Sequence, residues 1–368
     1  MRPKVALITG IGGQDGSYLA EFLLAKGYRV RGIIRRSSHP NTIRFEHLVR
    51  KYEGQSGPEC PFVVKYADLT DGVSIRHIIE EFQPDEIYNL GAQSHVGISF
   101  DNPESTININ TLGTLRILEC LRQMNSKCRF YQASSSEMFG ISPPPQSELT
   151  PMLPQSPYGI SKLAAYHLTR LYRNAYGLFA CNGILFNHES PRRGHNFVTK
   201  KITTEVARIL VGEIDHITLG NLDAKRDWGF SGEYIQAMWH ILQHDKPEDF
   251  VIATQETHTV REFLDECFSM LGLDYRDYLE TSDRFKRPAE VPALLGDATK
   301  AKEILGWVPT VKFNELARMM LAADVRHWME KTGKLPIEHG VHRDEEFYIT
   351  KARELAKKLP KRERKHVE

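Results

Sequence analysis

Two side chains in the middle of the chain are spaced for proton transfer to and from a small molecule. Ser156 followed by Pro157 is typical of the first turn of a helix. Tyr158 and Lys162 come next, four residues apart, so they would lie on one face of that helix. A nearby ammonium ion lowers the pKa of a phenol toward neutrality. We therefore expect Tyr158 to act as a base.

A hydroxyl group and a carboxyl group follow a strand further upstream. Ser135 and Glu137 come at the end of the predicted strand RFYQASS, and open α/β sheets bind ligands at the carboxyl ends of their strands. Glu137 could remove a proton from a carbon beside a ketone and return it to a departing hydroxyl group. This chemistry would be an elimination. The alternative is that Glu137 only caps the next helix.

The stretch NHESPRRG, residues 187–194, follows the apolar strand FACNGILF and would end at the same sheet edge. A polar loop of this kind is often only solvated charge. A diphosphate bound to a chain of nearly zero net charge, however, needs a local cluster of arginines. Candidates for that cluster are Arg192, Arg226 and Arg287.

A parallel sheet is needed to bring these residues together. Apolar, β-branched runs such as KVALIT, YRVRGII and FVVKYAD alternate with segments of helical period, which predicts buried strands joined by right-handed crossovers. We therefore predict an α/β fold with a doubly wound parallel Rossmann-type sheet and a smaller mixed α/β substrate-binding lobe. The predicted divisions are a nucleotide-binding domain over residues 1–187, with returning segments near 222–250 and 290–300, an interleaved lobe over 188–343, and a charged, solvated C-terminal helix over 344–368.

A glycine-rich turn after the first predicted strand indicates a dinucleotide site. Gly10, Gly13 and Gly16 in TGIGGQDGSY let the backbone approach a pyrophosphate and let the next helix pack closely. The second strand ends in RRSS instead of an acidic residue. Arginine binds a 2′-phosphate that a carboxylate would repel, so we predict NADP rather than NAD. The candidate contacts in this motif are Arg35, Arg36 and Ser37.

Composition limits the partners. The chain has 48 basic and 47 acidic side chains and a net charge of +1, so a general affinity for nucleic acid or for an anionic membrane is not expected. The five cysteines are scattered without a C-x-x-C pair, which predicts reduced thiols and no metal site. No run approaches the roughly 20 apolar residues that span a bilayer, and no signal sequence precedes KVALITG. We expect a soluble, cytoplasmic protein.

Several motifs together resemble one enzyme family. GQDGSYLAEFLL, RRSS, PYGISKLAAYH, LFNHESPRRG, RDWGF and RPAEV are similar to the GDP-mannose 4,6-dehydratase family of the extended short-chain dehydrogenase/reductase superfamily, from about residue 3 to residue 330. NHESPRRG is the most specific motif, because epimerases and decarboxylases of this branch lack it. The resemblance implies a lyase that uses NADP to convert GDP-mannose to its 4-keto-6-deoxy form. It also implies a homodimer or homotetramer with the RRSS loop at the interface.

The resemblance also implies three groups of site residues. The catalytic residues would be Ser135, Glu137, Tyr158 and Lys162. The cofactor would be bound by Gly10, Gly13, Gln14, Asp15, Gly16, Arg35, Arg36, Ser37, Asp68, Leu69, Leu90, Ala92, Ser94, Tyr158, Lys162, His188 and Arg193. The GDP-sugar would be bound by Ser94, Glu137, Asn187, Arg192, Lys201, Arg226, Arg287 and Glu290. Asp68 has a second interpretation, as the N-cap of the following helix.

The chain departs from the family pattern at Gly12, His195, Asn196 and Pro292. Another GDP-sugar, such as a GDP-heptose, therefore stays an alternative substrate. A GDP-sugar epimerase or reductase is a second alternative, although it would not need Glu137. A non-catalytic NADP(H) sensor is a third alternative, but it would have no use for an activated phenol.

Overall fold

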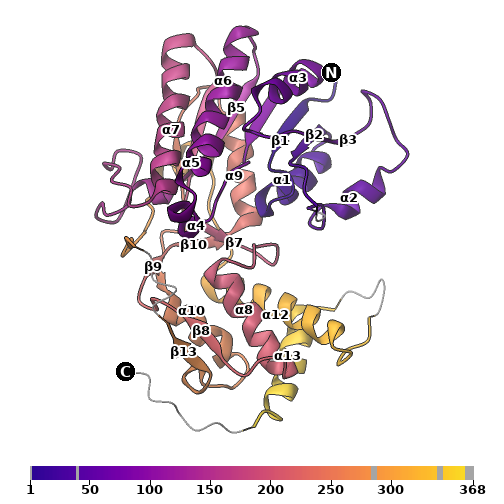
Figure 1. Ribbon diagram of the computed structural model, residues 1–368, viewed down its shortest axis with the longest axis vertical. Helices are drawn as coiled ribbons and strands as arrows, with labels where there is room; N and C mark the ends of the chain where they lie inside the picture. The colour runs from indigo at the N-terminus through magenta and orange to yellow at the C-terminus, as the bar shows by residue number, and fades with distance from the viewer. Residues whose placement is uncertain (1, 39–40, 283–287, 338–342, 361–368) are drawn as a thin grey trace.

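The computed structural model, which describes residues 2–38, 41–282, 288–337 and 343–360, has two lobes (Figure 1). The N-terminal lobe is built around a seven-stranded sheet in which every neighbouring pair is parallel. In spatial order the strands are β11 (Phe250–Ile252), β6 (Ala180–Leu185), β5 (Arg129–Ser135), β4 (Glu86–Asn89), β1 (Val5–Thr9), β2 (Arg29–Ile34) and β3 (Phe62–Tyr66). The order reverses between β1 and β4, which is the switch point where such sheets bind ligands.

Helices cover both faces of this sheet, so the predicted doubly wound α/β fold is confirmed. Helices α1 and α9 pack together on one face, and α3, α6 and α7 pack on the other. Strand β1 is buried along its whole length, which explains its unbroken apolar run. The helical segments of this lobe are α1 (Gln14–Ala25), α2 (Glu46–Lys51), α3 (Gly72–Phe82), α4 (Val96–Asp101), α5 (Pro103–Ile107), the π-helix η1 (Asn108–Leu112), α6 (Gly113–Gln123), the 3₁₀-helix η2 (Ser136–Met138), α7 (Pro157–Tyr176), α9 (Ser231–Gln243) and α11 (Thr299–Leu305).

The second lobe contains short strand pairs and a group of packed helices (Figure 1). Its strands are β7 (Asn187–Glu189) paired with β10 (Trp228–Phe230), β8 (Ile217–Leu219) with β13 (Leu279–Thr281), and β9 (Lys225–Arg226) with β12 (His258–Thr259). Its helices are α8 (Val198–Val211), α10 (Val260–Ser269), the 3₁₀-helix η3 (Tyr275–Asp277), α12 (Phe313–Lys331) and α13 (Glu345–Ala356). Because β7 follows β6 directly, the chain enters this lobe at the carboxyl-terminal end of a strand of the large sheet.

Each lobe has its own hydrophobic core, and the chain returns to the first core after leaving it. Buried residues of α9 and β11, and others between Val291 and Trp307, pack with the apolar side chains of β1 and α1. The second core joins α8, α10, α12 and α13. An interleaved chain path of this kind ties the two lobes together through several segments.

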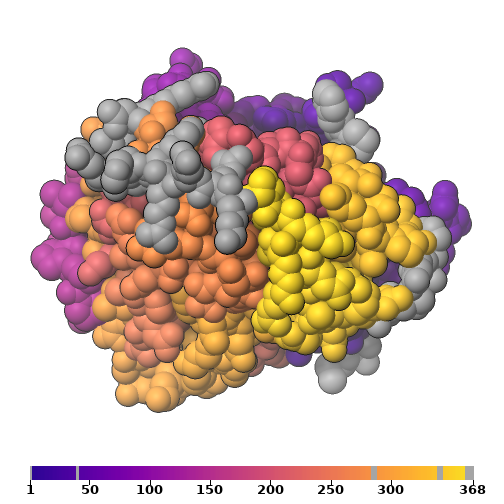
Figure 2. Space-filling model, turned by 90° about the horizontal axis from the view of Figure 1, so that it is seen from below, coloured from indigo at the N-terminus to yellow at the C-terminus, as the bar shows by residue number. Residues whose placement is uncertain are grey.

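The C-terminal helix differs from its sequence prediction. Its high charge predicts a solvated helix, but α13 buries Tyr348, Ile349 and Ala352 against α8 and α12. Figure 2 shows this yellow segment lying on the orange part of the second lobe. The prediction of a solvated segment is therefore wrong for Glu345–Ala356. The buried residues form one apolar stripe along an otherwise charged helix, and such a stripe is enough for a helix to pack against a hydrophobic core.

Two features of composition can be compared with the structure. All five cysteines are free and buried, as predicted for reduced thiols. Within the described parts of the chain, no helix is both long enough and apolar enough to cross a membrane.

We expect the docking of α13 to stabilise the second lobe. Ile349→Ala would leave a cavity at a side chain that is 0% exposed, and should lower the free energy of unfolding by about 2–5 kcal/mol. Chemical denaturation followed by circular dichroism measures the change. Glu354→Ala, at an exposed position of the same helix, is the matched control and should change stability by less than about 0.5 kcal/mol. Equal stability of the two variants would contradict the docking.

Candidate active site

Tyr158 and Lys162 lie in the first turns of α7 with both side chains in the protein interior. The helix begins as predicted, because Ser156 Oγ accepts a hydrogen bond from a first-turn N–H group at 3.0 Å and Pro157 is the first helical residue. Lys162 Nζ donates to the Ala133 carbonyl of β5 at 2.8 Å. It lies 5.8 Å from the centre of the Tyr158 ring. One helix face thus carries the phenol and the ammonium ion together.

Ser135 and Glu137 reach the same phenol from the end of β5. The side chains of Ser135 and Tyr158 are hydrogen-bonded, and the Glu137 carboxylate is close enough to raise the pKa of Tyr158. Glu137 is only 6% exposed. The backbone N–H of Glu137 is itself capped by Ser135 Oγ at 3.3 Å, so the serine holds the turn into η2. A hydroxyl group, a carboxyl group and a phenol therefore meet in one buried place.

Burial dominates the electrostatics of this group. It raises the pKa of Tyr158 to about 12, and the negative charges of Glu137 and Asp15 add to the rise. The Ser135 hydrogen bond and the Arg193 guanidinium act in the opposite direction. Burial also lowers the pKa of Lys162 to about 8. These protein groups leave the phenol neutral at pH 7, so its activation needs a further positive charge.

The glycine-rich turn between β1 and α1 is shaped for close backbone approach. Gly10 has a φ of +69°, and a Cβ there would lie 2.8 Å from backbone atoms of Gly91. A Cβ at Gly16 would lie 2.4 Å from the Gly10 carbonyl oxygen. No side chain caps the N-terminus of α1, where Gly13 is the N-cap. The first N–H groups of α1 are thus available to a phosphate.

Arginines gather around this turn. Arg44 donates from Nη1 to the Gly12 carbonyl at 3.2 Å and from Nε to the Arg192 carbonyl at 2.6 Å. Burial, followed by the charges of Arg192 and Arg193, lowers the pKa of Arg44. Guanidinium groups that lie close together in this way can bind an anion. Sequence reasoning missed Arg44, because its segment TIRFEHL carries no motif.

The remaining predicted cofactor residues follow the ends of β2, β3 and β4. Arg35, Arg36 and Ser37 are exposed after β2. Asp68 accepts hydrogen bonds from the backbone N–H and the hydroxyl group of Thr70, at 2.9 and 2.8 Å. Its second interpretation, as a helix N-cap, is wrong, because Asp71 caps α3. Leu69 is buried, Leu90 and Ala92 are half-buried, and Ser94 is exposed.

Residues at the start of α1 contact the 187–194 stretch directly. Gln14 donates from Nε2 to the His188 carbonyl at 3.0 Å and accepts from Ser190 Oγ at 2.8 Å. Asp15 Oδ2 lies 2.8 Å from His188 Nε2. The predicted cofactor residues Gln14, Asp15 and His188 are thus in mutual contact, with the His188 ring stacked on Tyr234 at 4.8 Å.

The polar side chains of NHESPRRG point to different neighbours. Asn187 Oδ1 is buried without a hydrogen-bond partner among the described residues, which suits a ligand donor. The side chain of Arg192 packs against α1. Its Nη2 lies 2.7 Å from Glu21 Oε1, and its guanidinium carbon lies 4.0 Å from the centre of the Tyr18 ring. Arg193 pairs with Glu189 at 3.0 Å. The positive charge of Arg193 also lowers the pKa of Tyr158.

The other predicted substrate residues lie in the second lobe. Arg226 donates to the Val291 carbonyl at 2.8 Å and pairs with Glu290 at 3.4 Å, so the structure brings this predicted pair together. Lys201 Nζ donates to the Thr218 carbonyl of β8 at 2.6 Å. The side chain of Arg192 lies apart from these residues, because it packs against α1. Arg287 lies outside the described residues.

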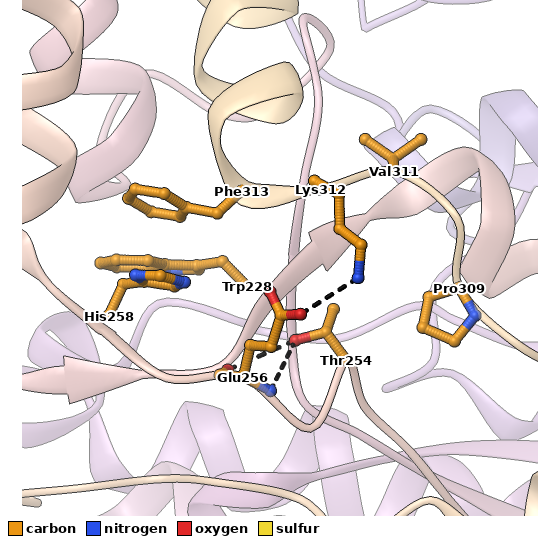
Figure 3. Close-up of a pocket in the computed structure, with 8 residues that line it drawn as sticks. All are labelled: Trp228, Thr254, Glu256, His258, Pro309, Val311, Lys312 and Phe313. Carbon is orange, nitrogen blue, oxygen red and sulfur yellow. Dashed lines mark hydrogen bonds and ion pairs between the residues drawn. The ribbon is translucent and has the colours of Figure 1, made fainter.

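A separate small pocket opens in the second lobe (Figure 3). The rings of His258 and Phe313 are stacked there at 3.8 Å, and Lys312 Nζ pairs with Glu256 Oε1 at 3.0 Å. Its full lining is Trp228, Thr254, Glu256, His258, Pro309, Val311, Lys312 and Phe313. These residues include none of the predicted site residues, so the pocket is distinct from the group formed by Ser135, Glu137 and Tyr158.

Comparison with known proteins points to one family. The family model for GDP-mannose 4,6 dehydratase matches residues 7–320. GDP-mannose 4,6 dehydratase 2 of Arabidopsis thaliana is 54% identical over 92% of this chain and 90% of its own length. The human GDP-mannose 4,6 dehydratase is 52% identical over 88% and 91%. RMD from Pseudomonas aeruginosa, solved with NADPH, shares the fold with a TM-score of 0.71 at 22% identity, covering 88% of this chain and 99% of that one. The chain belongs to the GDP-mannose 4,6-dehydratase family.

Proposed function

We propose that the protein converts GDP-D-mannose to GDP-4-keto-6-deoxy-D-mannose, the hydro-lyase reaction for which its family is named. The observation that carries this proposal is the approach of Glu137 to the Ser135–Tyr158 pair. Moving a hydride at one carbon requires only the tyrosine base. Removing a proton from the neighbouring carbon requires a second base, and Glu137 supplies it.

The side chains divide the proton transfers between them. Tyr158 takes the proton of the C4 hydroxyl group, with Ser135 hydrogen-bonded to it and Lys162 on the same helix face. NADP, when bound, would accept a hydride from C4 and return it to C6. The resulting 4-ketone acidifies the C5 proton, which Glu137 removes. The protonated Glu137 then donates to the departing C6 hydroxyl group, which leaves as water, so one carboxyl group serves both halves of the elimination. As the hydride returns to C6, C5 would receive a solvent-exchangeable proton, which completes the reaction.

The residues around the glycine-rich turn fit NADP. Gly10 and Gly16 let the turn pack closely on backbone atoms of Gly91 and on the turn itself, and the uncapped N-terminus of α1 suits the pyrophosphate. Arg35 and Arg36 would hold the 2′-phosphate. Asp68, Leu69, Leu90, Ala92 and Ser94 would line the rest of the dinucleotide, with Tyr158, Lys162, His188 and Arg193 near its reactive end.

The GDP-sugar would lie between the lobes. Arg226 would bind the diphosphate, because its guanidinium is buried and already held by Glu290. Asn187 would bind a sugar or ribose hydroxyl group through its unpartnered Oδ1. Lys201 and Arg287 are the other proposed ligands of the GDP-sugar. Because the side chain of Arg192 packs against α1, Arg192 would bind the cofactor rather than the GDP-sugar.

We further propose a homodimer or homotetramer. The exposed apolar residues Ile107, Leu112, Ile160 and Leu171 belong to α5, η1 and α7, which pack on one another. Exposed apolar residues on neighbouring helices suit contact with a second copy of the chain. The exposed RRSS segment would lie at a further interface. The five buried free thiols support a reducing compartment such as the cytoplasm.

Incubation with GDP-mannose in deuterated water tests the function. A dehydratase should give a product lighter by one water, with deuterium at C5 and no net change in NADPH absorbance, because the hydride returns to the sugar. Mass spectrometry and absorbance measure the three quantities. A panel that includes a GDP-heptose tests the alternative substrate. A product without deuterium would remove the role of Glu137, and an epimerised product of unchanged mass would overturn the dehydration.

Glu137→Gln should lower kcat by at least about 100-fold while KM for GDP-mannose changes by less than about threefold, because general acid–base groups contribute that much to the chemical step. Steady-state kinetics measures both. Glu104→Gln, at an exposed position of α5, is the control and should leave kcat unchanged. An unchanged turnover in Glu137→Gln would refute the proposed base.

The double variant Arg35→Ala/Arg36→Ala should weaken NADP binding by about tenfold or more and leave NAD binding nearly unchanged, because only NADP carries the 2′-phosphate. Titration calorimetry with each dinucleotide measures the two affinities. Arg50→Ala removes one exposed cation from α2 and is the control for general charge effects. Equal weakening of NADP and NAD would contradict the assignment.

A further inference from the structure

A buried carboxylate, Asp227, follows Arg226 directly, between β9 and β10. Asp227 is 0% exposed and Arg226 is 6% exposed. Asp227 Oδ1 accepts hydrogen bonds from the backbone N–H and the hydroxyl group of Thr254, at 2.8 and 2.7 Å. Its Oδ2 accepts from the backbone N–H groups of Gln255 at 3.0 Å and of Gly296 at 3.3 Å. A buried carboxylate with these contacts on both oxygens has a closely defined position.

The donors around Asp227 are all neutral groups that favour the ionised carboxylate. Burial raises the pKa of Asp227 to about 6, and the hydrogen bonds from Thr254, Gly296 and Gln255 act in the opposite direction. The carboxyl group is therefore mainly ionised at pH 7, where it only accepts hydrogen bonds. An amide in its place would turn an N–H group toward these donors. Only a carboxylate satisfies all of them at once.

The contacts of Asp227 join three segments that are far apart in the sequence. Thr254 and Gln255 follow β11, the edge strand of the large sheet, and Gly296 lies on the segment that returns to the first core. The Thr254 hydroxyl group also accepts from the backbone N–H of Glu256 at 3.3 Å, so it holds the turn after β11 (Figure 3). Asp227 thus ties the strands of the second lobe to the large sheet.

The same returning segment holds the guanidinium group of Arg226. Arg226 Nη1 donates to the Val291 carbonyl at 2.8 Å, and its Nη2 lies 3.4 Å from Glu290 Oε1. Gly296, which donates to Asp227, follows Val291 closely in the chain. The Asp227 carboxylate therefore restrains both the backbone that carries Arg226 and the segment that holds its side chain.

We propose that Asp227 is a positioning residue for the GDP-sugar: its carboxylate holds residues 254–255 and 296 against the strand of Arg226, and so fixes the guanidinium group that binds the diphosphate. This inference rests on the proposed function, because that function gives Arg226 its ligand. Paired hydrogen bonds from a guanidinium group to phosphate oxygens depend on its orientation, so a displaced Arg226 would bind the diphosphate less tightly. The proposed NADP site does not include Arg226.

Asp227→Asn keeps the shape of the side chain and should raise the Kd for GDP by about tenfold, because a displaced guanidinium group loses part of a charge-assisted contact. The KM for GDP-mannose should rise by a similar factor, while kcat and the Kd for NADP change by less than about threefold. Titration calorimetry and steady-state kinetics measure these constants, and circular dichroism checks the fold. Asp223→Asn, which removes an exposed carboxylate paired with Arg261 at 3.0 Å, is the control and should leave all four unchanged.

A double-mutant cycle tests whether Asp227 acts through Arg226. Arg226→Ala should weaken GDP binding, and adding Asp227→Asn should then weaken it by less than about twofold more, because the group that Asp227 positions is already gone. Losses that simply multiply in the double variant would contradict the inference.

Thr254→Val removes one donor to Asp227 and keeps the shape of the side chain, so it remains informative if Asp227→Asn fails to fold. It should raise the Kd for GDP by about threefold and leave the Kd for NADP unchanged, because it removes a single hydrogen bond. An unchanged Kd for GDP in this variant would count against the positioning role.

The outcomes separate the inference from the function. Normal GDP affinity in folded Asp227→Asn, with weakened affinity in Arg226→Ala, would overturn the role of Asp227 alone. Equal weakening of GDP and NADP binding would overturn it too, because it would indicate a general structural role. Normal GDP affinity in Arg226→Ala would refute the diphosphate role of Arg226 and the inference with it. The expected binding constants in a protein that dehydrates no GDP-sugar would refute the proposed reaction and support the role of Asp227.

Discussion

Burial of ionisable side chains at the carboxyl-terminal edge of one sheet is the constraint on which the site depends. Removal from water disfavours every charged form, which is why Tyr158 has a pKa of about 12 and Lys162 one of about 8. A charged form survives there only where an opposite charge or a set of hydrogen bonds compensates it. The pairs Asp15–His188 and Glu189–Arg193 supply such compensation beside the catalytic group. The charge state of each buried side chain in this site therefore depends on its charged neighbours.

The same constraint explains why the 187–194 stretch is held from both lobes. On the side of the sheet, Gln14 binds the backbone and side chains of this stretch. On the side of the helices, Lys200 donates to the Pro191 carbonyl at 3.0 Å and forms a buried ion pair with Asp324 of α12 at 2.6 Å. A loop fixed by only one lobe would move its arginines whenever the lobes moved. Attachment to both lobes restrains the position of this stretch, which includes Arg193.

Local pattern was enough to predict part of the fold and of the site. The glycine-rich turn, the start of α7 at Ser156 and Pro157, and the alternation of buried strands with helices are encoded over a few residues, and the structure confirms them. Arg44 and the placement of Arg192 depend on contacts between segments far apart in the chain, which no short motif records. The docking of α13 depends on a partner surface in the same way. Charge content alone does not reveal which face is buried.

Two departures from the family pattern, Gly12 and Asn196, have different surroundings. A Cβ at Gly12 would lie 2.6 Å from the Asn41 carbonyl oxygen, so glycine there follows from how the segment after β2 packs on the turn. Asn196 contacts His95 through its backbone carbonyl, at 3.2 Å from Nε2, and its side chain can vary without losing that contact. Neither change alters a side chain that meets Tyr158. The proposed elimination therefore does not depend on Gly12 or Asn196, because the proposed second base, Glu137, belongs to a different element.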